Sequence, residues 1–286
     1  MPLNIKPNHK NHIVTQIITV IVFILLALML MLLGRSIKEE IKQEKVTDKE
    51  IIAPVVVDKT LIKEVGLNTD SIYGTVSGTY PEFLNAESFF NDKIRNAVAI
   101  AQAEFENNSK ENYIARNETD PNFKTQTNNN IDSKIETGFI FNTNIKYVQV
   151  NENTISVLVN IYAFSGGAHG YEIPLSFNYD VKNKKEINLN DVFPNDVNYL
   201  QNISTYSKND LINQFQNKTK RADYDNDENY NASLNSLKNM IEIGTMPTLE
   251  NFSVFTLLPD TLNIHFSEYQ VAPYVYGSQM VKMPIN

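Results

Sequence analysis

The sequence predicts an α+β fold in which an antiparallel sheet packs against about three helices, preceded by a single N-terminal transmembrane helix. Three observations lead to this class. Apolar and polar residues alternate on both sides of a glycine-rich segment, three segments carry apolar residues at helical spacing, and one long apolar run lies near the amino terminus. Runs of strands that are interrupted by single helices are typical of α+β domains.

The apolar run covers residues 13–33, which are 21 residues without a charge. At 1.5 Å per residue a helix of this length spans roughly 30 Å, the thickness of a hydrocarbon core. The run is longer than the apolar part of a signal peptide, and no small-residue cleavage motif precedes the charged stretch after it. We therefore expect a short tail over 1–12, an uncleaved transmembrane helix over 13–33 and a charged linker over 34–54.

Charge and cysteine content exclude several kinds of site. Residues 1–53 hold 7 Lys/Arg and 5 Asp/Glu, so residues 54–286 carry 18 basic and 28 acidic side chains, a net of −10. An acidic domain repels nucleic acid and favours cationic partners. The absence of cysteine excludes disulfides, thiolate metal sites and cysteine nucleophiles. Nucleic acid is therefore not an expected partner.

The clearest strands flank the segment 165–170, which reads Ser-Gly-Gly-Ala-His-Gly. Apolar residues occupy every second position from Ile155 to Ala163 and again from Tyr171 to Val181. A period of two buries one face of a strand. Glycines permit the positive φ values that a tight loop needs. The pattern predicts an antiparallel hairpin with its loop at these glycines.

Further elements are expected on both sides of this hairpin. Before it we expect a bulged or edge strand over 72–80 with Gly74 and Gly78 inside it, a helix with an apolar stripe from Phe90 to Phe105, capped by Asn85 and ended by Asn107-Asn108, a loop over 110–132, and a strand over 139–147. After it we expect a turn over 182–185 that leads to Ile187 and Leu189 and in which Asn183 tolerates a left-handed conformation. We then expect helices over 199–215 and 234–241, the latter capped by Asn231 or Ser233 and ended by Gly244, and strands over 252–257, 262–266 and 280–285. We divide the folded part into an N-terminal module, 55–150, and a C-terminal module, 151–286.

Histidine chemistry is limited by number, because His169 and His265 are the only histidines after residue 53. A zinc site needs about three protein ligands, and Ser165 does not lie in the strand-to-helix motif of a serine nucleophile. We favour His169 as a loop residue that bonds to its own turn, with contact to a ligand or catalysis as alternatives. If the loop binds a ligand, we expect Gly166, Gly167, His169 and Tyr171 to contact it, because glycines allow close backbone approach.

Acidic and aromatic residues give less specific signals. The acidic run Asp223, Asp225, Asp227 and Glu228 begins like a calcium loop but lacks its later glycine and glutamate, so a solvated loop is favoured. Four carboxylates that could serve a glycosidase are not placed by sequence spacing; they are Glu172, Asp180, Asp191 and Glu268. Three tyrosines near the end could line a sugar-binding groove, although packing is favoured; they are Tyr269, Tyr274 and Tyr276.

Three stretches resemble one known family. They are the segment 165–170, the residues Ile187-Asn188-Leu189-Asn190-Asp191-Val192-Phe193, and the tail from Phe266 to Gly277, which contains Ser-Glu-Tyr-Gln-Val-Ala-Pro-Tyr-Val-Tyr. They are similar to the domain of unknown function shared by the lysozyme-sensing anti-sigma factor RsiV and the peptidoglycan deacetylase PdaC, and residues 71–150 resemble the smaller module that precedes it. The resemblance implies an α+β fold outside the membrane and, for RsiV, binding of lysozyme.

We therefore expect a single-pass protein of the cell membrane whose C-terminal domain is extracytoplasmic and binds or senses a ligand at the cell envelope. The expected ligand is a lysozyme-like basic protein or a cell-wall glycan such as peptidoglycan. The alternative is a cell-envelope hydrolase or an accessory domain of one. We favour a role without catalysis and assign no cofactor, no metal ligand and no catalytic residue.

Overall fold

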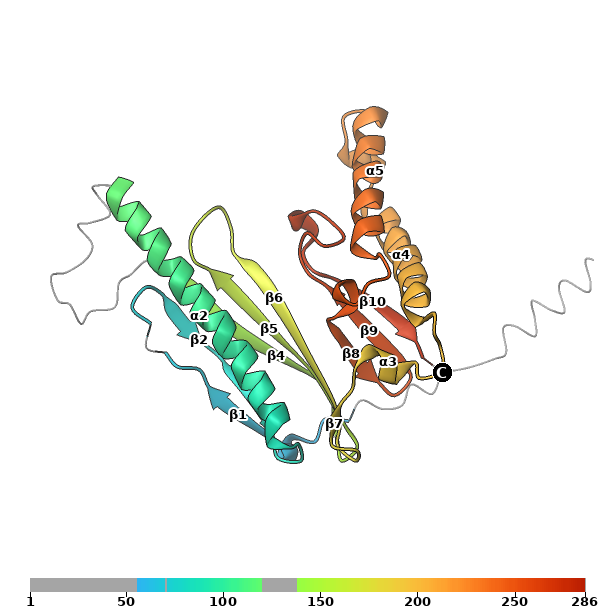
Figure 1. Ribbon diagram of the computed structural model, residues 1–286. Coiled ribbons are helices and arrows are strands. Elements are labelled where there is room, and N and C mark those ends of the chain that lie inside the picture. Colours follow the sequence, from blue (N-terminus) through green and yellow to red (C-terminus); the bar gives the residue numbers. More distant parts are fainter. Residues whose placement is uncertain (1–55, 70, 120–137, 286) are drawn as a thin grey trace, which may run out of the picture. The chain divides into compact units, whose positions relative to one another are not determined.

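The computed structural model describes residues 56–69, 71–119 and 138–285 (Figure 1). The contacts divide the chain into two compact units, Met1–Ile52 and Ala53–Asn286. The expected tail, transmembrane helix and linker lie outside the described residues. Among the helices that are described, none combines the length and apolarity that a membrane crossing requires. Both cores described below lie in the second unit, so we expect residues 53–286 to fold without residues 1–52.

The largest sheet has five strands in the order β2-β4-β5-β6-β7. The strands are β2 (Thr75–Ser77), β4 (Ile140–Val150), β5 (Thr154–Phe164), β6 (Tyr171–Asp180) and β7 (Lys185–Glu186). All neighbours are antiparallel except β2 and β4, which are parallel, so the sheet is mixed rather than purely antiparallel. Strands β5 and β6 pair from Thr154 with Asp180 to Ala163 with Tyr171, which confirms the predicted hairpin.

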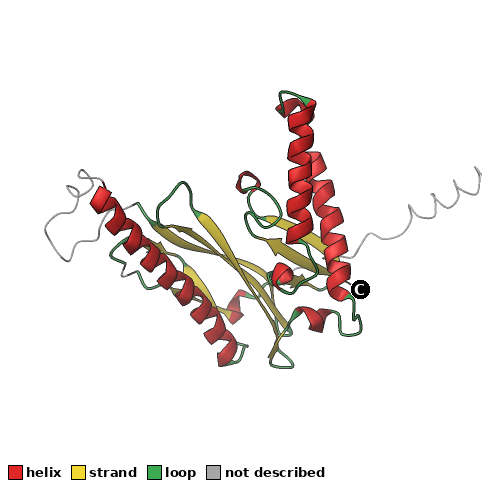
Figure 2. Cartoon of the chain, turned by 45° about the horizontal axis from the view of Figure 1, so that its top comes forward, coloured by secondary structure: helices red, strands yellow, loops and turns green. Residues whose placement is uncertain are grey.

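The first core lies between this sheet and helix α2 (Ser88–Thr119), which runs along the sheet in Figure 2. The side chains of β5 that were expected to be buried have no exposed surface; they are Ile155, Val157, Val159, Ile161 and Ala163. The stripe of α2 is buried against them, as predicted, through Phe90, Ile94, Val98, Ala101 and Phe105. Periods of two and of 3.6 residues therefore meet face to face in one apolar layer.

Helix α2 is longer than predicted. It continues through Asn107-Asn108 to Thr119, because neither a glycine nor a proline interrupts it there, and residues 110–119 of the expected loop are helical. The predicted N-cap was also wrong. Asn85 lies three residues before the first residue of the helix, and its side chain donates to the carbonyl of Asn151. The added turns carry Asn112, whose amide donates to the carbonyl of Ser165 at 2.8 Å.

The strand expected over 72–80 is divided at Gly78 into β2 and β3 (Thr79–Phe83), and β3 pairs with β1 (Ile62–Gly66) in a separate two-stranded sheet. Gly78 has φ of 104°, and a Cβ there would lie 2.2 Å from Oγ1 of Thr143 on β4. The glycine therefore allows the chain to turn from one sheet to the other against β4.

The second core belongs to a three-stranded antiparallel sheet of order β10-β9-β8 and its helices. These elements are β8 (Phe255–Leu258), β9 (Thr261–Phe266), β10 (Gln279–Pro284), α3 (Leu189–Val192), α4 (Tyr199–Lys218) and α5 (Asp227–Gly244). Short 3₁₀ turns are η1 (Lys59–Leu61), η3 (Arg221–Asp223), η4 (Glu250–Phe252) and η5 (Tyr274–Tyr276). Four α-helices thus appear in the described residues, where about three were expected.

Several local details in this half differ from the predictions. Leu189, which follows the turn over 182–185, begins the short helix α3, where Asn188 and Asp191 form a capping box. Helix α5 is capped by Asn226, whose side chain accepts from the amide of Asn229, and not by Asn231 or Ser233. In the turn before β7 the left-handed residue is Lys184, with φ of 54°, rather than Asn183. Gly244 does end its helix, as predicted.

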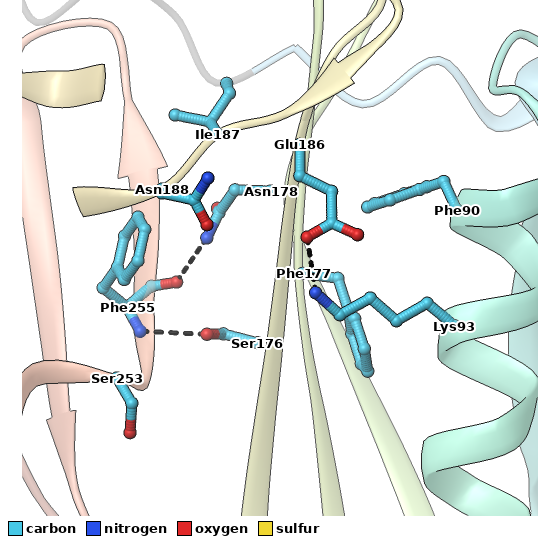
Figure 3. A pocket seen from close by; sticks show the side chains of 10 residues that line it. All are labelled: Phe90, Lys93, Ser176, Phe177, Asn178, Glu186, Ile187, Asn188, Ser253 and Phe255. Carbon is cyan, nitrogen blue, oxygen red and sulfur yellow. Dashed lines mark hydrogen bonds and ion pairs between the residues drawn. The ribbon is translucent and has the colours of Figure 1, made fainter. Parts of the chain in front are cut away.

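The polar face of the central hairpin binds the free edge of the second sheet, as Figure 3 shows for β6. Asn178 donates to the carbonyl of Phe255 at 2.8 Å, and Ser176 accepts from the amide of the same residue at 2.9 Å. Ser156 accepts from the amide of Leu257 at 2.8 Å and donates to the Asn178 side chain at 2.7 Å. These side chains satisfy the backbone of an edge strand.

The boundary expected after residue 150 falls in the turn between two paired strands, because β4 and β5 are neighbours in one sheet. The two apolar clusters divide later in the chain. The first includes residues up to Val181, and the second begins at Ile187.

Candidate binding site

Two segments that the sequence singled out lie against each other at the end of the central hairpin. The imidazole of His169 stacks on the ring of Tyr274, with centroids 3.8 Å apart and planes inclined by 21°. Tyr269 lies 5.7 Å from Tyr274 and 6.3 Å from His169. Tyr162 belongs to the same surface, because its hydroxyl oxygen lies against Gly170. It also contributes to the raised pKa of the Tyr274 hydroxyl. We call these four rings the aromatic patch.

The glycines give the loop its shape. Gly166 has φ of 114° and Gly167 has φ of 96°, as the hairpin prediction required. The Cα of Gly166 faces Phe139 and Asn112, so the loop is fixed against α2, whereas open space surrounds Gly167. The tail segment needs a left-handed residue too, and this is Tyr269 with φ of 64°, a conformation uncommon for a bulky side chain. Tyr269 is 55% exposed.

Hydrogen bonds join the His169 ring to its own turn and to the tail. Nδ1 of His169 lies 2.8 Å from the carbonyl of Gly170, which can only accept, so Nδ1 carries the proton. In the neutral ring Nε2 is then an acceptor, and the Tyr269 hydroxyl donates to it at 3.3 Å. The Tyr274 hydroxyl donates to the same Gly170 carbonyl at 3.1 Å. His169 thus bonds to its own turn, as the favoured interpretation stated, and also to the tail.

Two carboxylates border the aromatic patch. Glu268 accepts from the backbone amide of Glu172 at 3.4 Å, and Glu172 accepts from the hydroxyl of Ser278 at 3.1 Å. Partial burial, followed by the negative charge of Glu268, raises the pKa of the Tyr274 hydroxyl above its usual value. Glu172 raises the same pKa, so both glutamates lie near the Tyr274 hydroxyl. Among the ion pairs between described residues, none includes either of them.

The structure brings some of the predicted site residues together and separates others. His169 is an exposed member of the aromatic patch, Gly167 is exposed in the same loop, and Gly166 faces Phe139 and Asn112. Tyr171 packs instead against the first core. Of the three late tyrosines, Tyr269 and Tyr274 enter the patch, while Tyr276 packs against Phe215 with ring centroids 5.2 Å apart.

Sequence reasoning did not identify Tyr162 as part of the site. It lies on β5 opposite Glu172 and is exposed. The available signal was an aromatic residue at a polar position of the alternating pattern, just before the glycine-rich loop. The other carboxylate candidates are held within their own turns: Asp180 accepts from Asn183, and Asp191 accepts from Lys185 and Asn188. These bonds lower the pKa of both aspartates.

The acidic run 223–228 lies between α4 and α5, as predicted, with its last two residues in the first turn of α5. Asp227 forms an ion pair with Arg221. Acidic side chains in a first turn also interact favourably with the helix dipole, so the structure accounts for these charges without a ligand.

His265 lies away from the patch, on β9, where its Nε2 is 3.0 Å from the Thr256 hydroxyl. Burial, together with the nearby positive charge of Lys146, lowers its pKa from 6.5 to about 4. Burial disfavours the charged imidazole, so the unfolded chain binds more protons than the folded chain between these two values.

His265 is therefore expected to have little effect on the free energy of unfolding of residues 53–286 above pH 6.5. Below that pH it should lower this free energy as the pH decreases toward 4. From about pH 7 to about pH 5 the loss from His265 should reach about 2 kcal/mol. Urea unfolding of the wild type and of His265→Gln checks this. The variant should lose about 2 kcal/mol less over the same interval; an identical decrease in both proteins would refute the assignment.

Comparison with protein families gives two matches along the chain. Residues 67–172 match the family described as "Deacetylase PdaC", and residues 190–286 match "Protein of unknown function (DUF3298)". The peptidoglycan-N-acetylmuramic acid deacetylase PdaC of Bacillus subtilis (strain 168) is 28% identical over 234 residues. The alignment covers 78% of this chain and 43% of that protein, so the chain spans less than half the length of this relative.

Two solved structures are similar to this chain. A DUF3298 family member from Bacteroides fragilis NCTC 9343 has a TM-score of 0.47 and 16% identity, with 78% of this chain and 89% of that chain covered. A DUF3298 family protein from Pseudomonas aeruginosa PAO1 has a TM-score of 0.49 and 13% identity, with 82% and 92% covered. The family matches confirm the predicted resemblance. One segment of this chain matches the PdaC deacetylase family, and a later segment matches DUF3298.

Proposed function

We propose that this protein is an extracytoplasmic binding or sensing domain at the cell envelope, held to the cell membrane by residues 13–33 as a single-pass anchor. The ligand binds at the aromatic patch and is a cell-wall glycan or a lysozyme-like basic protein. The apolar run supports the anchor, since its length matches a hydrocarbon core.

One observation carries the proposal: segments about a hundred residues apart, around His169 and Tyr269, build an outward-facing stacked aromatic surface. Tyr269 is 55% exposed and is not among the buried residues of either core, so packing does not account for its ring. Flat aromatic rings take sugar faces by stacking, and the same rings beside carboxylates take basic side chains. Both ligand classes therefore fit this surface.

The family matches agree with a role at the envelope. The Bacillus subtilis relative is named for deacetylation of N-acetylmuramic acid in peptidoglycan. The matched part is less than half of that protein, so its activity is not assigned to this chain. A domain similar to part of a cell-wall enzyme fits recognition of the wall or of proteins that act on it.

Residues 53–286 should bind purified peptidoglycan or lysozyme saturably, and Tyr269→Ala should weaken this binding about tenfold because it removes the exposed ring. Titration at low and moderate salt checks this, since binding of a basic protein to an acidic surface weakens with salt. Tyr230→Ala, far away at the start of α5, is the control and should bind like the wild type. Absence of binding to either ligand would contradict the proposal and leave a structural stalk domain.

A second candidate is a cell-envelope hydrolase, which is favoured by two glutamates at the border of the aromatic patch, where the backbone amide of Glu172 donates to Glu268 at 3.4 Å. Glycoside hydrolysis uses two carboxylates that flank the scissile bond. In a hydrolase, Glu172→Gln, Glu268→Gln or His169→Ala would abolish release of reducing sugar from peptidoglycan. In a binding domain no such release occurs with the wild type, and these variants change affinity alone.

A further inference from the structure

Three of the four rings of the aromatic patch, His169, Tyr269 and Tyr274, direct their hydrogen-bond donors into the protein. The proton on Nδ1 of His169 and the hydroxyl proton of Tyr274 both point to the Gly170 carbonyl. The hydroxyl proton of Tyr269 points to Nε2 of His169. The lone pairs on the Tyr269 oxygen remain available to solvent. The donors of these three rings are therefore already used inside the protein.

The rim adds negative charge that the described residues do not balance. Glu172 and Glu268 accept one hydrogen bond each, from Ser278 and from a backbone amide, although a carboxylate has about four acceptor sites. Neither forms an ion pair with a described lysine, arginine or histidine. Both are partly exposed, so a ligand can reach the remaining lone pairs.

The ring faces have the same polarity as the rim. The face of an aromatic ring carries the negative part of its quadrupole and attracts cations, while its flat apolar area stacks on the C–H face of a sugar. Tyr269 and Tyr162 are 55% and 39% exposed. The complementary ligand is consequently a ring with an apolar C–H face that also bears a positively charged donor.

Resting on the proposed function, we infer that the ligand of the aromatic patch is a de-N-acetylated amino sugar of the cell wall, with its ring on Tyr269 and its ammonium group at Glu172 and Glu268. An ammonium supplies three donors and a positive charge to a surface of acceptors. An N-acetylated sugar has a neutral acetamide in that place, which brings no positive charge to Glu172 and Glu268. The reaction class that supplies this ligand is N-deacetylation of wall glycan, the kind of reaction for which the Bacillus subtilis relative is named.

The experiment measures binding of the full chain, in detergent micelles, to a glucosamine oligomer, to the matched N-acetylglucosamine oligomer and to lysozyme. The pH is kept at about 7, where an imidazole of ordinary pKa is mostly neutral and an amine of ordinary pKa is still protonated. The wild type should bind the glucosamine oligomer about tenfold more tightly than the acetylated one. Glu172→Gln with Glu268→Gln should remove this preference, while both glutamines can still accept the bonds from the Glu172 amide and Ser278.

The matched control neutralises two exposed charges elsewhere, through Asp225→Asn with Glu228→Gln in the acidic run. This variant should keep the preference; equal loss in both variants would show that general acidity attracts the oligomer and would overturn the inference. Equal binding of both oligomers, or binding of lysozyme alone, would overturn the inference and leave the proposed function standing. Failure of all three probes to bind would overturn both.

Discussion

Replacing Gly244 with alanine should lower the free energy of unfolding of residues 53–286 by about 2–3 kcal/mol, because the site is already filled. A Cβ at this position would lie 2.1 Å from the backbone oxygen of Gln270 and 2.8 Å from the side chain of Val271. The neighbour is backbone, which cannot turn away as a flexible side chain would. The end of α5 or the tail segment must therefore move.

The same substitution should weaken binding at the aromatic patch. The side chain of Gln270 ties the tail to the carbonyls of Gly244 and Asn251, at 3.3 and 3.0 Å. Movement of Gln270 shifts the adjacent Tyr269. Gly66→Ala is the control, since nothing lies within 4 Å of its Cβ and its φ is ordinary. Urea unfolding and the ligand titration check both effects; a Gly244→Ala variant as stable as Gly66→Ala would contradict the described packing.

Asn178→Ala should lower the free energy of unfolding by about 3 kcal/mol, since it leaves buried polar groups without partners. Its side chain is 6% exposed and joins Ser156 on β5 to the carbonyl of Phe255 on β8. An unpaired buried carbonyl or hydroxyl costs about 1–3 kcal/mol each. The loss also removes part of the link between the two sheets.

Asn160→Ala is the matched control on β5, where a half-buried asparagine lies opposite Pro174. It should change stability by less than about 1 kcal/mol. Urea unfolding monitored at both cores would separate the two variants further. Equal destabilisation by Asn178→Ala and Asn160→Ala would show that the bonds to β8 do not contribute as described.

The fold class and most strands could be predicted because alternation reports burial directly. The apolar positions of β5 are completely buried. The role of the polar positions could not be predicted, since a face that binds another sheet through Ser156, Ser176 and Asn178 has the same pattern as a face in water. Period two tells which face is apolar and leaves open what covers the other face.

The length of α2 and the location of the patch show a second limit. Two asparagines have low helix propensity, but tertiary contacts such as the bond from Asn112 to Ser165 outweigh it. The loop and the tail were each recognisable as motifs. Their contact joins residues such as His169 and Tyr269, a hundred positions apart, and no local pattern encodes that. The side chain of Tyr171, assigned to the site from its position next to the loop, packs inward instead.

The most direct test of the central claim follows the histidine ring signals of residues 53–286 by NMR during titration with peptidoglycan fragments and with lysozyme. This part of the chain contains two histidines, one in the aromatic patch and one half-buried on β9. We predict that ligand shifts or broadens the His169 signals and leaves those of His265 unchanged, and that Tyr269→Ala removes the effect. Saturable binding that leaves the His169 signals unchanged would contradict the claim that the aromatic patch is the binding site.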